Sequence, residues 1–195
     1  MLIVLWHIFI SPFGLVKFKH FFLADILTSF VQPLKDLGTI TCFFATSRWF
    51  SSDDPTQCAG LENYQIVIAF LPYWFRFAQC FVRYRETRLT PNLVNAGKYF
   101  SSICIQGAAA YRVKAKSDTI STIIWIIVAI ISTFYCLYWD YTMDWGLFKT
   151  KKPGKKYLRE ELKYPVFYYY FAMISNFILR FFWVLGIPTF PGPVK

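Results

Sequence analysis

The chain is 195 residues long; hydrophobic residues make up 56% of it and charged residues only 16%, whereas about 25% is typical of soluble domains. This composition excludes an intrinsically disordered protein, which needs low hydrophobicity and high charge. The net charge of +10 raises nucleic acid as a partner, but the basic residues lie in short clusters between long apolar blocks. That arrangement is typical of an integral membrane protein with basic cytoplasmic loops, so nucleic acid is not an expected partner.

Apolar stretches follow one another along the chain, and about 20 apolar residues suffice to cross the hydrocarbon core of a bilayer. They run over residues 2–16, 20–44, 64–82, 93–111, 119–139 and 165–187. The sequence therefore predicts an all-α, polytopic transmembrane helix bundle of about six helices. Residues 1–17 would form a partial or first span, residues 18–187 the membrane domain, and residues 188–195 a tail rich in Pro and Gly.

The loops between these stretches differ in charge. Basic residues gather at 83–88 and 149–163, whereas the loop at 45–62 is acidic. The positive-inside rule places the two basic loops in the cytoplasm and the acidic loop on the other side. Cys42 and Cys58 bracket the acidic loop, and a disulfide between them would close it in an oxidising compartment, although their spacing alone fixes no connectivity.

Several apolar stretches contain charges, each of which costs roughly 2.5–3.5 kcal/mol on membrane-insertion scales and so marks a candidate functional site. The cations Arg76, Lys98 and Arg180 outnumber the carboxylates Asp25 and Asp140 by one. One interpretation is a set of salt bridges that hold helices together. The other is a partly wet, positively biased cavity for anions, because guanidinium groups suit phosphate oxygens.

Helical spacing places more polar side chains beside these charges, because residues three or four apart share one face of a helix. Thr28 follows Asp25 by three residues, Asp144 follows Asp140 by four, and Trp183 follows Arg180 by three. Gln79 and Asn176 lie on the same faces as Arg76 and Arg180, respectively.

Motifs of enzymes and nucleotide-binding proteins are absent from the sequence: it contains no GxxxxGK[ST], GxGxxG, HExxH or GxSxG pattern. The chain has two histidines and scattered cysteines without a CxxC pair, so a zinc site is not expected. We therefore expect neither an enzyme nor a protein with a metal or another cofactor.

Seven segments, in this order, resemble the EXS domain of the family that includes the xenotropic and polytropic retrovirus receptor, the plant PHO phosphate exporters and the yeast SYG and ERD proteins. They are FFLADILTS (21–29), LPYWFRFAQC (71–80), RYRETR (83–88), NAGKY (95–99), WDYTMDWGLF (139–148), LREE (158–161) and ILRFFW (178–183). The resemblance covers about residues 18–187.

The resemblance implies a helical exporter of inorganic phosphate. It assigns the family's phosphate pathway to residues that the cost of membrane insertion had already singled out. In the expected mechanism phosphate leaves the cytosol down its gradient, the cations neutralise it in turn, the carboxylates hold those cations, and Trp183 acts as an apolar plug. The predicted pathway residues are Asp25, Thr28, Arg76, Lys98, Tyr99, Asp140, Asp144, Arg180 and Trp183.

The chain departs from the family pattern at several positions. Ile26 replaces the usual Gln of the ADQLTS-like motif, and Val82 stands where the family commonly has an Arg. We expect that the regulatory SPX domain and the family's last helix, with its RRxxWN motif, are missing from these residues, as in a truncated member.

Two alternatives remain open at this level. One is a Golgi-type EXS protein that acts in phosphate recycling and in the retention of resident proteins, and the other is a non-conducting, truncated subunit. The expected location is correspondingly the plasma membrane or the Golgi. The expected partners are inorganic phosphate, membrane lipids and, as an open alternative, a second copy of the chain.

A first prediction concerns topology. Cysteines introduced by Ser52→Cys and Thr150→Cys should react with an impermeant thiol reagent from opposite sides of the membrane, because the loops at 45–62 and 149–163 differ in charge. Labelling of both cysteines from one side would refute this topology.

Overall fold

The computed structural model describes Trp6 and residues 17–45, 61–116, 118–148, 157–159 and 161–187. Throughout these residues the regular structure is helical and no strand occurs, which confirms the predicted all-α class. The chain divides into two compact units, Met1–Ala129 and Ile130–Lys195. The division falls within α6 (Thr119–Trp139).

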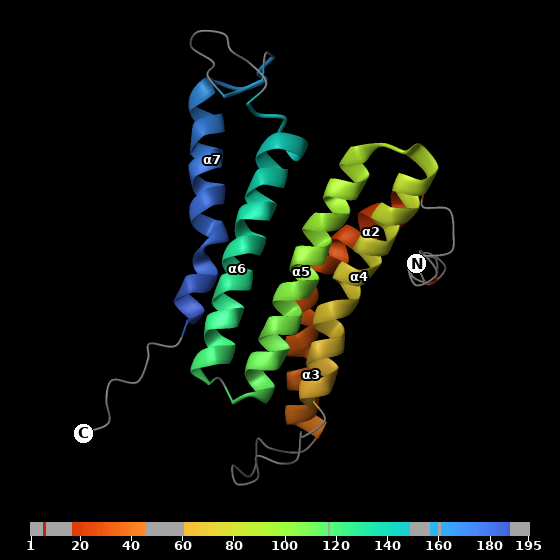
Figure 1. Ribbon diagram of the computed structural model, residues 1–195, viewed down its shortest axis with the longest axis vertical. Coiled ribbons are helices and arrows are strands. Elements are labelled where there is room, and N and C mark those ends of the chain that lie inside the picture. The colour runs from red at the N-terminus through yellow and green to blue at the C-terminus, as the bar shows by residue number, and fades with distance from the viewer. Residues whose placement is uncertain are drawn as a thin grey trace, which may run out of the picture. The chain divides into compact units, whose positions relative to one another are not determined.

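The first unit is built around one long helix. α4 (Leu61–Thr87) packs against α2 (Phe18–Ser29), α3 (Val31–Ala45) and α5 (Thr90–Lys114). In Figure 1, α4 and α5 run side by side as a hairpin, and α2 and α3 follow one another along α4. This arrangement brings polar residues from three different helices onto α4.

The stretch at 20–44, predicted as one span, is two helices, and in this respect the prediction is wrong. α2 ends at Ser29, and Phe30 separates it from α3. The cause lies in Pro33, which has no N–H and whose ring would clash with the carbonyl of Ser29, four residues earlier. Proline is tolerated in the first turn of a helix, where Pro33 lies in α3.

A tight turn joins α4 to α5. Arg88 adopts a left-handed conformation with φ of 56°. The Thr87 hydroxyl accepts hydrogen bonds from the Leu89 N–H at 3.3 Å and from Asn92 Nδ2 at 2.8 Å. These bonds satisfy the backbone at the start of α5 and fix the antiparallel return of the chain.

Two glycines in the first unit have opposite surroundings. A Cβ atom on Gly38 of α3 would lie 2.3 Å from Cε1 of the Tyr64 ring, whose hydroxyl donates to the Leu34 carbonyl at 3.2 Å. A Cβ on Gly107 of α5 would meet nothing within 4 Å among the described residues. Gly38 therefore allows the close approach of α3 and α4, whereas Gly107 is not needed for packing within the described chain.

The second unit contains the rest of α6, the π-helical turn η2 (Asp140–Asp144), α7 (Val166–Arg180) and the 3-10 turn η3 (Phe182–Gly186). The helix α6 begins at an Asp118 cap, since the Ser121 N–H donates to Asp118 Oδ1 at 2.9 Å. Hydrogen bonds from Ser121 hold the pKa of the Asp118 carboxyl below its usual value. In η2 the Trp145 N–H donates to the Asp140 carbonyl, five residues earlier, at 2.8 Å.

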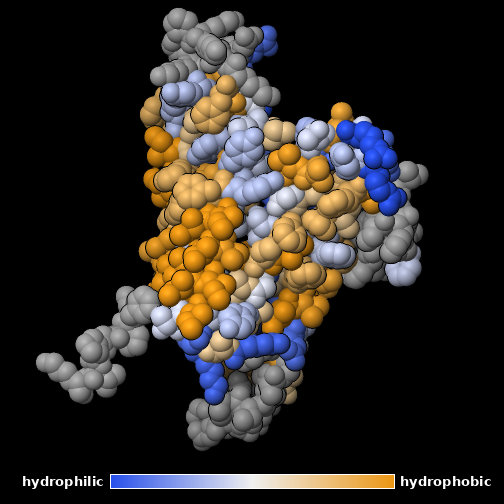
Figure 2. All heavy atoms as spheres, viewed as in Figure 1, coloured by the Kyte–Doolittle hydropathy of each residue, from blue (hydrophilic) through white to orange (hydrophobic). Residues whose placement is uncertain are grey.

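Three helical stretches among the described residues are long and apolar enough to cross a membrane: Asn63–Thr87, Thr119–Asp144 and Val166–Leu185. They contain the predicted stretches 64–82 and 119–139 and most of 165–187. The predicted stretch 93–111 lies in α5, and the one at 2–16 lies outside the described residues. Hydrophobic side chains cover the sides of the helices in Figure 2, and hydrophilic ones gather mainly at their ends.

The cysteines fall into two groups. Cys80, Cys104 and Cys136 take part in no disulfide, and each lies within a helix. Cys42 is disulfide-bonded. Because Cys58 and most of the loop at 45–62 lie outside the described residues, the Cys42–Cys58 pairing stays a prediction.

The glycines give a prediction on stability. Gly107→Ala should raise the free energy of unfolding by up to about 1 kcal/mol, because alanine is the better helix former. Gly38→Ala should instead lower it by about 1–3 kcal/mol, because the new methyl group overlaps the Tyr64 ring. Thermal unfolding in detergent would compare the two, and equal shifts would contradict the close α3–α4 contact.

Candidate anion sites at two carboxylate–arginine clusters

Arg76 lies at the centre of a polar cluster in the first unit. Its side chain is 1% exposed, and Nε lies 3.3 Å from Oδ1 of Asp25 on α2. Nη2 donates to the Tyr99 hydroxyl on α5 at 2.9 Å, and that hydroxyl donates to Asp25 Oδ1 at 2.7 Å. Nη1 donates to Gln79 Oε1 at 3.1 Å. We call Asp25, Arg76, Gln79 and Tyr99 the Arg76 cluster.

Two aromatic rings complete the surroundings of this guanidinium. Its carbon lies 3.8 Å from the centre of the Phe21 ring and 4.7 Å from that of Tyr99. Such contacts stabilise a cation that is shielded from water. Gln79 Nε2 in turn donates to the His20 carbonyl at 3.3 Å, which ties α4 to the start of α2.

Two more predicted pathway residues, Lys98 and Thr28, lie next to members of the Arg76 cluster. The ammonium of Lys98 lies 5.6 Å from the centre of the Tyr99 ring. The Thr28 hydroxyl donates to the Asp25 carbonyl at 2.7 Å, within its own helix. The structure thus brings Asp25, Arg76 and Tyr99 into direct contact, with Lys98 beside them.

Asp140 and Arg180 form the second cluster, within the second unit. Arg180 donates from Nε to Asp140 Oδ2 at 2.9 Å, and its Nη2 also donates to that oxygen. Asn176, one helical turn before Arg180, donates from Nδ2 to the same oxygen at 3.2 Å. We call Asp140, Asn176 and Arg180 the Arg180 cluster. The Asp140 side chain is 11% exposed, and that of Arg180 is 30% exposed.

The structure places the remaining predicted residues of the second unit outside this cluster. Oδ1 of Asp144 accepts a hydrogen bond from Trp139 Nε1 at 2.9 Å. Trp183 lies in η3, because α7 ends at Arg180, and its Nε1 donates to Thr133 Oγ1 at 3.0 Å. The expected helical stripe of Asn176, Arg180 and Trp183 is therefore interrupted before its last member.

Gln79 and Asn176 were absent from the predicted pathway residues, yet both donate or accept hydrogen bonds within the clusters. The sequence feature that could have identified them is their spacing, because Gln79 lies three residues after Arg76 and Asn176 lies four before Arg180. Across the part of the chain that the structure describes, no group of three or more His, Cys, Asp or Glu side chains could hold a metal ion.

This chain belongs to the helical integral membrane proteins. It has long apolar helices, and charged side chains on its helices are paired with one another. Within that class, the chain belongs to the EXS family, whose model matches residues 1–192.

Curated relatives agree with this family. The chain is 38% identical to solute carrier family 53 member 1 of Mus musculus and to the xenotropic and polytropic retrovirus receptor 1 homolog of Xenopus laevis, in each case over 94% of the chain and 29% of the relative. It is 35% identical to the SPX and EXS domain-containing protein 1 of Dictyostelium discoideum, over 97% of the chain and 21% of the relative. The chain thus spans less than a third of the length of these relatives.

The Arg76 cluster gives a prediction on stability. Tyr99→Phe should lower the free energy of unfolding by about 1–3 kcal/mol, because it removes the hydroxyl that bonds both Arg76 and Asp25. Tyr111→Phe, an exposed position on the same helix, should change it by less than about 0.5 kcal/mol. Similar unfolding temperatures for the two variants in detergent would contradict a bridging role for Tyr99.

Proposed function

We propose that this chain forms part of a membrane pathway that exports inorganic phosphate. The observation that carries the proposal is the placing of an arginine against a carboxylate in each unit, on helices that include the membrane-spanning ones. Relatives named as solute carriers over the same region support a transport role.

The chemistry of the clusters suits a multiply charged oxyanion. A guanidinium presents paired N–H donors whose spacing fits two oxygens of a carboxylate or of a phosphate. Asp25 and Asp140 would hold the arginines in position in the absence of phosphate. An arriving phosphate would then exchange with the carboxylate as the acceptor of those hydrogen bonds.

Local charge supports binding near the first cluster. Arg76 lies beside Asp25, and Lys98 lies beside the Tyr99 ring, so two cations are near an anion that reaches this cluster. The Asp25 side chain is 55% exposed while Arg76 is buried, so the carboxylate is the accessible member of the pair. Repulsion between this carboxylate and the phosphate would favour release of the anion and prevent a static complex.

The aromatic residue Trp183 would act as an apolar plug, as the family resemblance implies. Its indole is fixed by the hydrogen bond to Thr133, and Phe181 packs edge-to-face on Phe134 at 5.7 Å between ring centres. The Trp183 side chain would be anchored to α6, and the hydrogen bond to Thr133 would have to break before the indole could move.

A second candidate function has its own observation. Each arginine has its carboxylate in place, which is also the geometry of a purely structural ion pair. Because both arginines are already paired, this geometry favours the alternative functions. These are a non-conducting subunit, or a Golgi-type EXS protein that acts in phosphate recycling and in the retention of resident proteins. The location in the plasma membrane or the Golgi is part of the same choice.

The variant Arg180→Lys distinguishes the two candidate functions experimentally. If Arg180 binds phosphate through its planar group, phosphate efflux from vesicles that contain the variant should fall by about tenfold or more, because an ammonium cannot reproduce two parallel hydrogen bonds. Thermal unfolding of the variant should change little, since the charge beside Asp140 is kept.

Arg85→Lys is the matched control, because Arg85 is exposed in the last turn of α4. Its efflux should equal that of the unaltered chain. Normal efflux from well-folded Arg180→Lys would remove Arg180 from the phosphate site, and the absence of efflux from the unaltered chain would favour the alternative function.

A further inference from the structure

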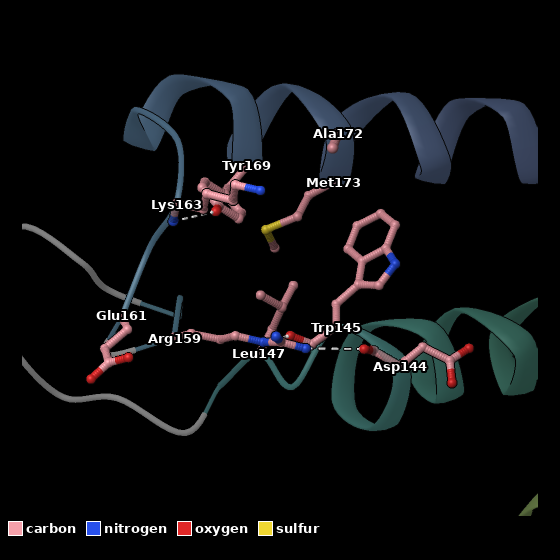
Figure 3. Close-up of a pocket in the computed structure, with 9 residues that line it drawn as sticks. All are labelled: Asp144, Trp145, Leu147, Arg159, Glu161, Lys163, Tyr169, Ala172 and Met173. Carbon is pink, nitrogen blue, oxygen red and sulfur yellow. Dashed lines mark hydrogen bonds between the residues drawn. The ribbon is translucent and has the colours of Figure 1, made fainter.

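A cavity of about 390 Å³ in the second unit lies apart from the Arg180 cluster residues. The segment that follows η2 forms one wall and the first turns of α7 form the other, as Figure 3 shows. The residues that matter for its chemistry are Trp145, Leu147, Arg159, Lys163, Ala172 and Met173.

The interior of this cavity is apolar. In Figure 3 the Trp145 indole points toward α7, and the Met173 thioether points back from α7 into the space between the walls. Leu147 lies beneath them and is only 3% exposed. A free inorganic anion would gain nothing from such a lining, whereas a hydrocarbon group would be removed from water.

The rim of the cavity is basic. Arg159 donates from Nε to the Trp145 carbonyl and from Nη2 to the Asp144 carbonyl, the latter at 3.1 Å. Both acceptors are neutral, and a guanidinium carries five N–H groups, so donors remain for a ligand. Gly146, with φ of 61°, makes room for this arginine: a Cβ there would lie 3.2 Å from Nε.

Among the residues that the structure describes, neither Arg159 nor Lys163 has a carboxylate within ion-pair distance. Two acidic residues also line the cavity, but among the described residues neither forms an ion pair with these cations. The Asp144 carboxylate accepts from Trp139, and the Glu161 carboxylate points away from the cavity in Figure 3. Within the described part of the chain, the rim therefore presents the guanidinium of Arg159 and the ammonium of Lys163 with no carboxylate paired to either.

The position of the cavity along the helices indicates where a ligand would bind relative to the membrane. The stretch Thr119–Asp144 ends at one wall, and the stretch Val166–Leu185 begins at the other, so the cavity lies at the ends of two helices that are long and apolar enough to span a membrane. In the sequence, residues 149–156 lie between the segments that form the two walls, and five of these residues are lysines. Basic segments directly beside a spanning helix attract anionic lipids.

We propose that this cavity binds an anionic phospholipid. The phosphate of the headgroup would contact Arg159 and Lys163, and the adjoining glycerol and first acyl carbons would lie against Met173 and Leu147. Only a ligand that carries negative charge and hydrocarbon in one molecule uses both the rim and the interior. The proposal goes beyond phosphate export and does not depend on it.

Native mass spectrometry of the detergent-purified chain tests the proposal with dioctanoyl phosphatidic acid, and with dioctanoyl phosphatidylcholine as the comparison lipid. The chain should retain phosphatidic acid in preference to phosphatidylcholine. Ala172→Phe should abolish this retention, because Ala172 faces the cavity and a phenyl ring would fill it without removing a charge. Lys163→Gln should weaken retention about tenfold through the loss of a charge-assisted hydrogen bond.

Matched controls keep the result specific to the cavity. Ala172→Ser adds no comparable volume and should retain the lipid, and Lys114→Gln removes an exposed charge at the end of α5 and should also retain it. Circular dichroism would establish that each variant is folded, and Lys163→Gln decides the matter if Ala172→Phe does not fold.

Four results would overturn the proposal. Retention of phosphatidic acid by folded Ala172→Phe, or equal weakening by Lys114→Gln and Lys163→Gln, would assign the lipid to general surface charge. Equal retention of phosphatidylcholine would remove the selectivity for negative charge. Displacement of the lipid by inorganic phosphate would make the rim a site for the free anion.

Discussion

Burial of the Arg76 guanidinium is the constraint on which the first unit depends. The group is permanently charged and 1% exposed, so the helices themselves must supply its counter-charge and its hydrogen-bond acceptors. The carboxylate comes from α2, the phenol from α5 and the amide from α4 itself. Leaving one member of a buried ion pair without its partner typically costs about 3–5 kcal/mol, so these helices cannot separate independently of one another.

The two clusters have opposite patterns of exposure. In the first, the arginine is buried and the Asp25 carboxylate is 55% exposed; in the second, Asp140 is 11% exposed and Arg180 is 30% exposed. An anion that reached the first cluster would meet the carboxylate before the arginine, whereas at the second it would meet the arginine directly. Under the proposed function, the first cluster would admit an anion only as Asp25 moves, and the second would bind one without such a movement.

Sequence reasoning predicted what depends on the helical repeat. The spacing of Arg76 with Gln79, and of Asn176 with Arg180, placed each pair on one face, and the structure confirms both as neighbours. It could not predict which carboxylate meets which arginine, because contacts such as Tyr99 with Asp25 join residues 74 positions apart. It also missed the break at Phe30, where the missing N–H and the ring of Pro33 outweigh a continuous apolar pattern. The end of α7 at Arg180 likewise separates Trp183 from a face on which regular spacing had placed it.

The π-helical turn η2 has a consequence for how this region can change in evolution. A π turn holds one residue more than an α-helical turn, and it commonly behaves as a single inserted residue. Deleting one residue between Asp140 and Trp145 would restore ordinary i→i−4 bonding and remove the local bulge, while α6 before it kept its course. The Asp144 and Trp145 carbonyls, which Arg159 binds, lie at the end of this turn and would be displaced. The position of Arg159 beside the cavity therefore depends on the length of this turn.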